Sequence, residues 1–446
     1  MTARMRTLLT AILASILTAI LAFSFLARSE FYNPFDENSH YDYVVRIASD
    51  ASLPPRDATI SQQALQDWAC SGVLGFDQLS CGAATQDPAK APWAGANTAL
   101  RYFPTYYVLT ALPTRIIHDV GSASWLDAAR IATTGWLIVL SISLVLLTRR
   151  LGMGVLTSLA TAVFVCSMPM VVVQGTSMNN DIAGAAVAVL AVWSWLALRT
   201  HSGRTRLFVS GGLALSAMTI KENALVAVLA IALLEWSDRY QEAQDSLHWS
   251  QWRALRMPAA LVTAIGAGYV LLLYVLDPVV RGPASTAAEE LVAAAVAGVE
   301  PQDWGLATAK AYNYLPYGLQ SAGFIPVFSG AWAQLIPVFA SMVVVGTLMF
   351  RVMRTTWPWI SDTSAIVAQS SLAYLASFPV LFFVLMKAQG LPLVFQPRYF
   401  LPGLILGATM LFLGLSRRWS IAALAGSAAV YVFMLLQVYS ATTPTG

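Results

Sequence analysis

The stretch that decides the class of fold is LLTAILASILTAILAFSFLA, residues 8–27. A helix rises about 1.5 Å per residue, so this run can cross the ~30 Å apolar core of a membrane. Arg4 and Arg6 precede it, as in a secretory signal peptide, but the run is longer than the ~7–15 apolar residues of such a peptide. We therefore expect an uncleaved membrane anchor.

Composition extends this expectation to the whole chain. Of its 446 residues, 57% are hydrophobic and 11% are charged, against roughly 25% charged in a soluble protein. The net charge of +3 is spread thinly along the sequence, which excludes nucleic acid as a partner because no basic stripe exists to neutralise phosphates. About ten further apolar runs follow the first, at residues 125–147, 152–173, 182–198, 207–219, 224–234, 258–276, 332–350, 365–386, 400–415 and 421–439. We expect an all-α polytopic membrane protein with about 11 transmembrane helices in a single integral membrane domain, residues 1–446.

Basic residues predict the orientation, because cytoplasmic loops carry an excess of lysine and arginine. An N-in, C-out topology places the arginine pairs at 149–150 and 417–418 in the cytoplasm. It leaves two large extracytoplasmic loops, residues 28–124 and 277–330. Within the first, we expect the aromatic run 102–117 to lie on the membrane surface as an interfacial helix. A true crossing, paired with another miscounted helix, is the alternative.

Two of the three cysteines, Cys70 and Cys81, fall in the first large loop. This loop faces the oxidising compartment in the expected topology, so we predict a structural disulfide between them. Two free thiols are the alternative.

Four polar clusters at the expected outer face are the candidate functional residues. The first, Asp36-Glu37-Asn38-Ser39-His40, directly follows the first crossing. Paired acids beside a histidine can supply a general base for a hydroxyl acceptor. A solvated loop or a cation site would explain the same residues.

A second cluster, Asn180 and Asp181, begins the fourth apolar run from the outside. Either residue could instead cap the helix, because Asn and Asp are preferred N-caps. A third, Lys221-Glu222, lies in a tight outer turn, where a lysine at the membrane surface suits a phosphate.

The fourth cluster, Gln396-Pro397-Arg398-Tyr399, stands at the outer end of the tenth run. Arginine offers a planar fork of donors that matches phosphate oxygens. Snorkelling to the interface is the ordinary alternative for such an arginine. All four clusters share one expected face, and together they combine acids with cations, as transfer from a lipid phosphate requires.

Together these motifs resemble the GT-C superfamily of membrane glycosyltransferases, which includes protein O-mannosyltransferases and aminoarabinose transferases. The motifs are Asp36-Glu37-x-x-His40, the later Asn180-Asp181, and Gln-x-Arg-Tyr-Phe-Leu-Pro at 396–402. The aromatic stretch YFPTYY at 102–107 is similar to the Pro-Pro-Leu-Tyr-Tyr element of that family.

The resemblance implies surface helices in the first loop and an inverting transfer of a sugar from a polyprenyl-phosphate donor to an envelope glycan or lipid. It implies an active site on the extracytoplasmic side of a bacterial inner membrane. It assigns catalysis to the acids Asp36 and Glu37, with Asp36 as base. The donor phosphate would face Arg398, Lys221 and Tyr399. The substrate would meet the remaining residues of these motifs, namely His40, Asn180, Asp181, Tyr106, Gln396 and Glu222.

Other functions stay open at this point. The sequence has no Gly-rich nucleotide loop, no Asp-x-Asp and no spaced histidine pair, so we assign no cofactor and no metal ligand, although the acids and His40 could hold a divalent cation. A transporter or flippase of lipid-linked glycans would also have many crossings. A noncatalytic membrane assembly subunit is a third alternative.

Overall fold

The protein is all-helical, as the apolar runs predict. A computed structural model describes residues 2–28, 37–71, 79–91, 95–243, 255–283, 312, 315, 331–354, 362–388 and 396–440. Within these ranges no strand forms, and the only β pairing is an isolated bridge between Thr59 and Ala96.

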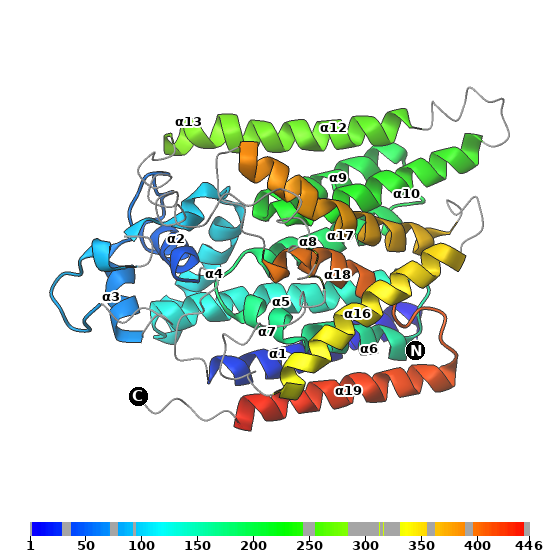
Figure 1. The fold of residues 1–446 in the computed structure, drawn as a ribbon, viewed down its shortest axis with the longest axis horizontal. Helices are drawn as coiled ribbons and strands as arrows, with labels where there is room; N and C mark the ends of the chain where they lie inside the picture. Colours follow the sequence, from blue (N-terminus) through cyan, green and yellow to red (C-terminus); the bar gives the residue numbers. More distant parts are fainter. Residues whose placement is uncertain are drawn as a thin grey trace.

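Long helices lie side by side in one bundle, and the short α2 and α3 gather at one end of it (Figure 1). The first part of the chain forms α1 (Ala3–Leu26), α2 (Glu37–Asp50), α3 (Gln62–Ser71), α4 (Thr105–Gly121), α5 (Trp125–Arg150), α6 (Val155–Cys166), α7 (Pro169–Thr176), α8 (Asp181–Ala197), α9 (Gly203–Ile220) and α10 (Leu225–Ala243). The second part forms α12 (Arg256–Val270), a π-helical continuation (Leu271–Leu276), α13 (Asp277–Arg281), α16 (Ala331–Arg354), α17 (Thr363–Ala388), α18 (Leu401–Ala408) and α19 (Arg417–Ser440).

Six of the described helices are long and apolar enough to cross a membrane, which supports a polytopic membrane protein. They are α1, α5, α12 with its continuation through α13, α16, α17 and α19. The pair α6 and α7 would add a seventh span, although it is bent by 70°. Pro169 begins α7 at this bend, where its missing N–H and its ring interrupt a continuous helix.

The remaining apolar runs are also helical but fall short of these criteria. The apolar helix α8 has 17 residues, and the run 400–415 contains only the 8-residue α18. A turn follows α18, and Gly414 adopts a positive φ of 79° there, which ends the run before it reaches spanning length. The larger count of about eleven crossings therefore stays a prediction.

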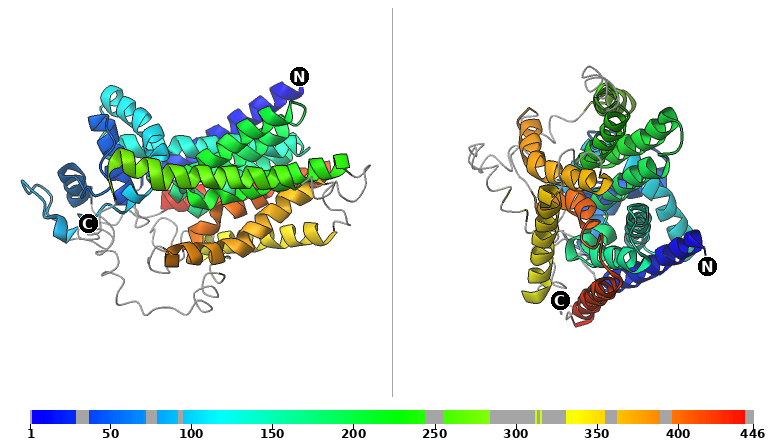
Figure 2. Two further views of the ribbon diagram at one scale, coloured as in Figure 1. Left: turned by 90° about the horizontal axis from the view of Figure 1, so that it is seen from above. Right: turned by 90° about the vertical axis from the view of Figure 1, so that its right-hand side faces the viewer.

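The shortest central helices form the core. Every residue of α7 is buried, and α8 is buried along nearly its whole length because α5, α9, α10 and α18 pack around it. The first and last helices, α1 and α19, lie side by side at the outside of the bundle (Figure 2). The Tyr431 hydroxyl of α19 donates to the Leu17 carbonyl of α1, at 3.0 Å. The central helices α7 and α8, including the first residues of α8, are thus buried, whereas α1 and α19 lie at the outside.

The two ends of the bundle differ in what lies there (Figure 1). At the loop end, α2 and α4 pack against α5, and Glu37 at the start of α2 contacts the Met178 backbone just before α8. At the basic end, α5 finishes at Arg150, α9 begins near Arg206 and α16 finishes near Arg351. The arginines that predict the orientation thus share one end, while the side of the membrane that each end faces stays a prediction.

The aromatic run 102–117 forms α4, which packs against α2 and α5. Tyr106 and Tyr107 lie on its buried side. Its outer face exposes large apolar side chains one turn apart, namely Val108, Leu112, Ile116 and Val120. Such a face is typical of a helix that contacts lipid, and whether α4 lies on the membrane or crosses it stays a prediction.

The expected pairing of Cys70 with Cys81 is present in the structure, with an S–S distance of 1.99 Å. It joins the end of α3 to the segment that precedes α4. Of the second large loop, residues 277–330, the structure describes 277–283 and two single positions, so that prediction lies almost wholly outside the described residues.

Candidate functional site

A buried carboxylate that faces two cations forms the centre of the candidate site at the loop end. Asp181 Oδ1 lies 3.5 Å from Lys221 Nζ, and Asp181 Oδ2 lies 3.4 Å from Arg398 Nε. The three side chains are 0%, 1% and 2% exposed. Neither Asp181 oxygen has a hydrogen-bond partner among the described residues, so its contacts with the two cations are ion pairs only.

Local structure at the start of α8 aims Asp181 into this site. The side-chain oxygen of Asn179 accepts from the Asp181 backbone N–H at 2.8 Å and so takes the capping role. The Asn180 amide instead donates to the Ile220 carbonyl at 2.7 Å. The interpretation of Asn180 as a side-chain cap is therefore wrong, and Asp181 is left to face the cations.

Two tyrosines flank the cations. The Lys221 ammonium donates to the Tyr102 hydroxyl at 2.9 Å and lies 4.2 Å from the centre of the same ring. The Tyr399 ring lies 5.8 Å from both Lys221 Nζ and the Arg398 guanidinium. Burial opposes the charge of Lys221, but nearby Asp181 raises the pKa of this lysine overall. Lys221 is therefore a fixed positive charge at neutral pH.

An aromatic cluster connects the predicted His40 to these tyrosines. The His40 ring stacks on Tyr102 and Tyr107, with centroids 5.7 and 5.6 Å away. Its Nδ1 is 2.8 Å from the Tyr107 hydroxyl. Tyr106 meets His40 edge-on, and its hydroxyl is 3.1 Å from that of Thr133. His40 and Tyr106 are thus supports behind Tyr102, which itself contacts Lys221.

Glu37 is held by an arginine that the sequence analysis did not single out. Arg130 of α5 donates from Nε and Nη2 to the two Glu37 oxygens, each at 2.9 Å. The Met178 backbone N–H donates to Glu37 Oε1 at 3.2 Å. Because Met178 lies three residues before Asp181, this buried contact fixes the start of α2 against the start of α8.

A second arginine positions the chain that carries Tyr102. Arg281, at the end of α13, is paired with Asp277 at 2.6 Å and donates to the carbonyls of Leu100 and Tyr102, at 2.9 and 3.1 Å. It also donates to the Tyr43 hydroxyl at 2.6 Å. Burial raises the pKa of Tyr43, so this phenol stays neutral.

Amide groups near these cations have polar atoms that lack partners. Both polar side-chain atoms of Asn223, which is 1% exposed, have no hydrogen-bond partner among the described residues, and the same holds for Asn180 Oδ1 and Gln396 Oε1. Burying such a group without a partner costs about 1–3 kcal/mol. Amides of this kind are suited to hydrogen-bond the hydroxyl groups of a polar ligand.

The structure thus brings together His40, Tyr106, Asp181, Lys221, Arg398 and Tyr399 through direct or shared contacts. Glu222, half-buried, adjoins Lys221 and contributes to its raised pKa. Asp36 lies outside the described residues. No group of three or more His, Cys, Asp or Glu suited to a metal occurs within the described part of the chain, and a divalent cation that uses Asp36 stays a prediction.

Arg130 and Arg281 are the main residues that sequence reasoning missed. A signal existed for Arg130, because it lies inside the apolar run 125–147, where an unpaired charge would be costly. Arg281 had a weaker signal, since it falls at the boundary of a predicted loop.

No protein-family model matches this chain, and no curated protein matches it. The functional assignment therefore depends on the geometry of the site and on the resemblance of its motifs.

Proposed function

We propose that the protein is an inverting glycosyltransferase of the GT-C type. It would move a sugar from a polyprenyl-phosphate donor to an envelope glycan or lipid acceptor on the extracytoplasmic face of a bacterial inner membrane. One observation carries the proposal. Lys221 and Arg398, far apart in sequence, meet on one buried carboxylate at the end of the bundle that carries the first large loop.

The charge at this site suits a phosphate. Asp181 and Glu222 offset Lys221 and Arg398, and Arg101, which donates to the Tyr102 hydroxyl at 3.1 Å, leaves one positive charge in excess. Arginine and lysine in a buried setting stabilise a developing phosphate charge more strongly than they would in water. Asp181 holds the two cations in place before the donor binds, and this preorganisation lowers the cost of reaching the transition state.

The reaction divides between the cations and Asp36. The Asp36 carboxylate takes the proton of an acceptor hydroxyl, and the oxygen attacks the anomeric carbon of the donor sugar. The bond from that carbon to the phosphate oxygen breaks, and its electron pair leaves with the polyprenyl phosphate. Lys221 and Arg398 stabilise that leaving group. Glu37 is already bound to Arg130 in a two-pronged contact, so in this proposal it positions the loop and Asp36 alone is the base.

The placement of charge favours a transferase over the transporter alternative. The fully buried charged residues of the described chain gather at the two ends of the bundle, around Asp181 and Arg281 at one end and around Arg206 at the other. Transporters bind their substrates near the midplane of the membrane, at broken helices. A polar site at one end instead suits a reaction at the membrane surface with a lipid-bound donor.

To test this proposal, purified protein is incubated with a panel of radiolabelled polyprenyl-phosphate sugars, and transfer of the label to extracted envelope lipids and polymers is measured. We expect transfer from at least one donor, and we expect Lys221→Met to abolish it. Lys90→Met is the matched control, because Lys90 is an exposed lysine of the first loop. Absence of transfer from every donor, or equal transfer by Lys221→Met and Lys90→Met in inserted protein, would overturn the proposal.

A further inference from the structure

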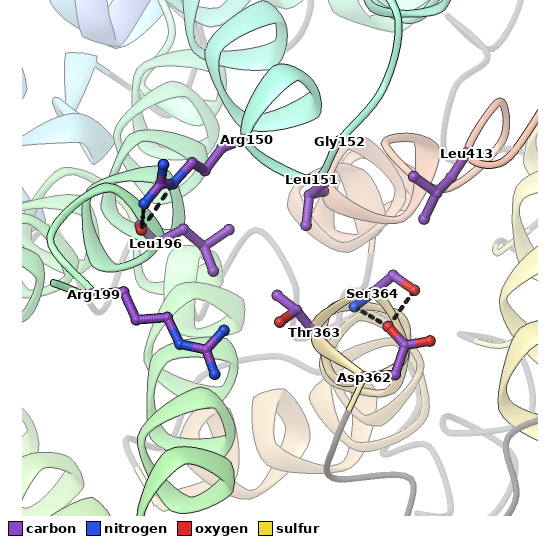
Figure 3. A pocket seen from close by; sticks show the side chains of 9 residues that line it. All are labelled: Arg150, Leu151, Gly152, Leu196, Arg199, Asp362, Thr363, Ser364 and Leu413. Atoms are coloured by element: carbon purple, nitrogen blue, oxygen red, sulfur yellow. Dashed lines mark hydrogen bonds between the residues drawn. The ribbon is translucent and has the colours of Figure 1, made fainter.

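A polar pocket lies at the basic end, away from Asp181. It encloses about 600 Å³ between the end of α5, the end of α8, the start of α17 and the chain after α18. Its polar wall carries Arg150, Arg199, Asp362 and Thr363, and its apolar wall carries Leu151 and Leu413 (Figure 3). Helix α8 runs between the two sites, with Asp181 at its first residue and Leu196 near its end.

Two arginines and one acid, Asp362, line this pocket, so its lining carries one positive charge in excess. Arg150 donates from Nε and Nη2 to the Leu196 carbonyl, at 2.9 and 2.8 Å, and has no carboxylate within ion-pair distance among the described residues. Arg199 is 41% exposed and shares Asp238 with Arg206. Both pocket arginines therefore keep donors available for a further anion.

The opposite wall adds donors of its own. Helix α17 begins at Thr363, and Asp362 accepts from the backbone N–H and the hydroxyl of Ser364, at 2.8 and 2.7 Å. This leaves the Thr363 hydroxyl facing the arginines across the pocket (Figure 3). The start of a long helix also carries partial positive charge, which favours an anion.

We propose that this pocket binds a phosphate group, and that the phosphate belongs to an anionic lipid headgroup. Arginine pairs match phosphate oxygens in geometry and charge. The leucine wall provides the apolar boundary that the glycerol and upper acyl chain of a lipid require. Basic pockets between membrane helices commonly hold such headgroups. This site is independent of the proposed transferase reaction at the other end of the bundle.

The test titrates full-length protein in detergent with short-chain phosphatidylglycerol, short-chain phosphatidylcholine or inorganic phosphate, and reads bound ligand by native mass spectrometry. We expect phosphatidylglycerol to bind more tightly than phosphatidylcholine. Arg150→Gln and Arg199→Gln should each weaken it about fivefold, because a basic residue contributes about that factor at an anionic lipid surface. Arg204→Gln is the control, since Arg204 is exposed and lies outside the pocket.

The possible outcomes distinguish a lipid ligand, a site for free phosphate and the absence of a site. Binding of phosphatidylglycerol that inorganic phosphate does not displace supports a lipid ligand. Displacement by inorganic phosphate keeps the phosphate site and overturns the lipid assignment. Equal binding by wild type and Arg199→Gln overturns the site itself, and this substitution at an exposed position keeps the test valid if Arg150→Gln does not fold.

Discussion

The two ends of the bundle both bury arginine beside carboxylate, but they do so differently. At the basic end, Arg206 donates to Glu235 at 2.7 Å and to Asp238 at 2.9 Å, and Arg239 completes the network with a 2.8 Å bond to Glu235. At the loop end, the contacts of Asp181 are ion pairs of 3.4 and 3.5 Å, and no described residue donates a hydrogen bond to its oxygens.

The difference separates two uses of buried charge. At the basic end, both oxygens of Glu235 and both oxygens of Asp238 accept hydrogen bonds, although Arg206 Nε has no partner among the described residues, so the role of this network is to hold helices together. A buried group without hydrogen bonds costs stability, and in a native structure a catalytic role or a bound partner is one explanation for it. We therefore expect substitutions at Lys221 and Arg398 to change turnover and substitutions at the network of Arg206, Glu235 and Asp238 to change stability.

The largest expected effect concerns the base. Asp36→Asn should keep the donor bound but remove the proton acceptor, which lowers turnover by the ~10²–10⁴ typical of general-base loss. The measurement is kcat in the label-transfer assay. Asp57→Asn, at an exposed acid of the same loop, is the control and should transfer normally. Normal turnover by folded, inserted Asp36→Asn would end the catalytic assignment of the first acidic cluster.

The next effect concerns the phosphate contact. Arg398→Ala should lower kcat/KM by about 10²-fold, as the loss of one charge-stabilising donor does in other enzymes. It should also raise the KM for the donor, because the cation meets the phosphate before and during transfer. Arg398→Lys should restore only part of the loss, since a point charge cannot make a two-pronged contact. Full restoration by lysine would show that charge alone matters.

The third prediction concerns the network of Arg206, Glu235, Asp238 and Arg239 at the basic end, where we expect stability and not turnover to change. Glu235→Gln should lower the free energy of unfolding by about 2 kcal/mol, because Arg206 and Arg239 lose charged hydrogen-bond partners. Its KM and kcat in the transfer assay should stay near wild type. Denaturant or thermal unfolding in a fixed detergent measures the first quantity. A large loss of turnover with unchanged stability would remove the distinction between the two ends.

The smallest effect belongs to the disulfide. Replacing both Cys70 and Cys81 by serine should change turnover by less than about twofold, as expected of exposed positions away from the site. Mass spectrometry after alkylation without reductant should find neither Cys70 nor Cys81 alkylated in wild type, because both are in the disulfide. Quantitative labelling of both in native protein would contradict the bond.

From the sequence, it could be predicted that the polar clusters of the site lie at one end of the bundle, but not which side chains contact each other there. Asp181, Lys221 and Arg398 could be placed at one end because loops alternate between the two ends of an up-and-down helical bundle. The pairing of Glu37 with Arg130 joins residues 93 positions apart and depends on how α2 packs over α5. No periodicity in the sequence encodes that packing.

Helix formation was similarly predictable, but helix length was not. Each apolar run contains a helix where the structure describes it, because a helix satisfies its own backbone hydrogen bonds within an apolar environment. The run 400–415 nevertheless yields only the short α18, since its end turns at Gly414. The bend at Pro169 had a visible signal, whereas its angle of 70° depends on the neighbouring helices.

The most direct test of the central claim, that Lys221 and Arg398 bind the donor phosphate, compares two matched double variants in the label-transfer assay. One removes the buried cations, Lys221→Met with Arg398→Ala, and the other removes exposed cations of the first loop, Lys90→Met with Arg115→Gln. The account predicts no detectable transfer by the first variant and transfer within about twofold of wild type by the second. Equal transfer by the two, in protein shown to be folded and inserted, would contradict it.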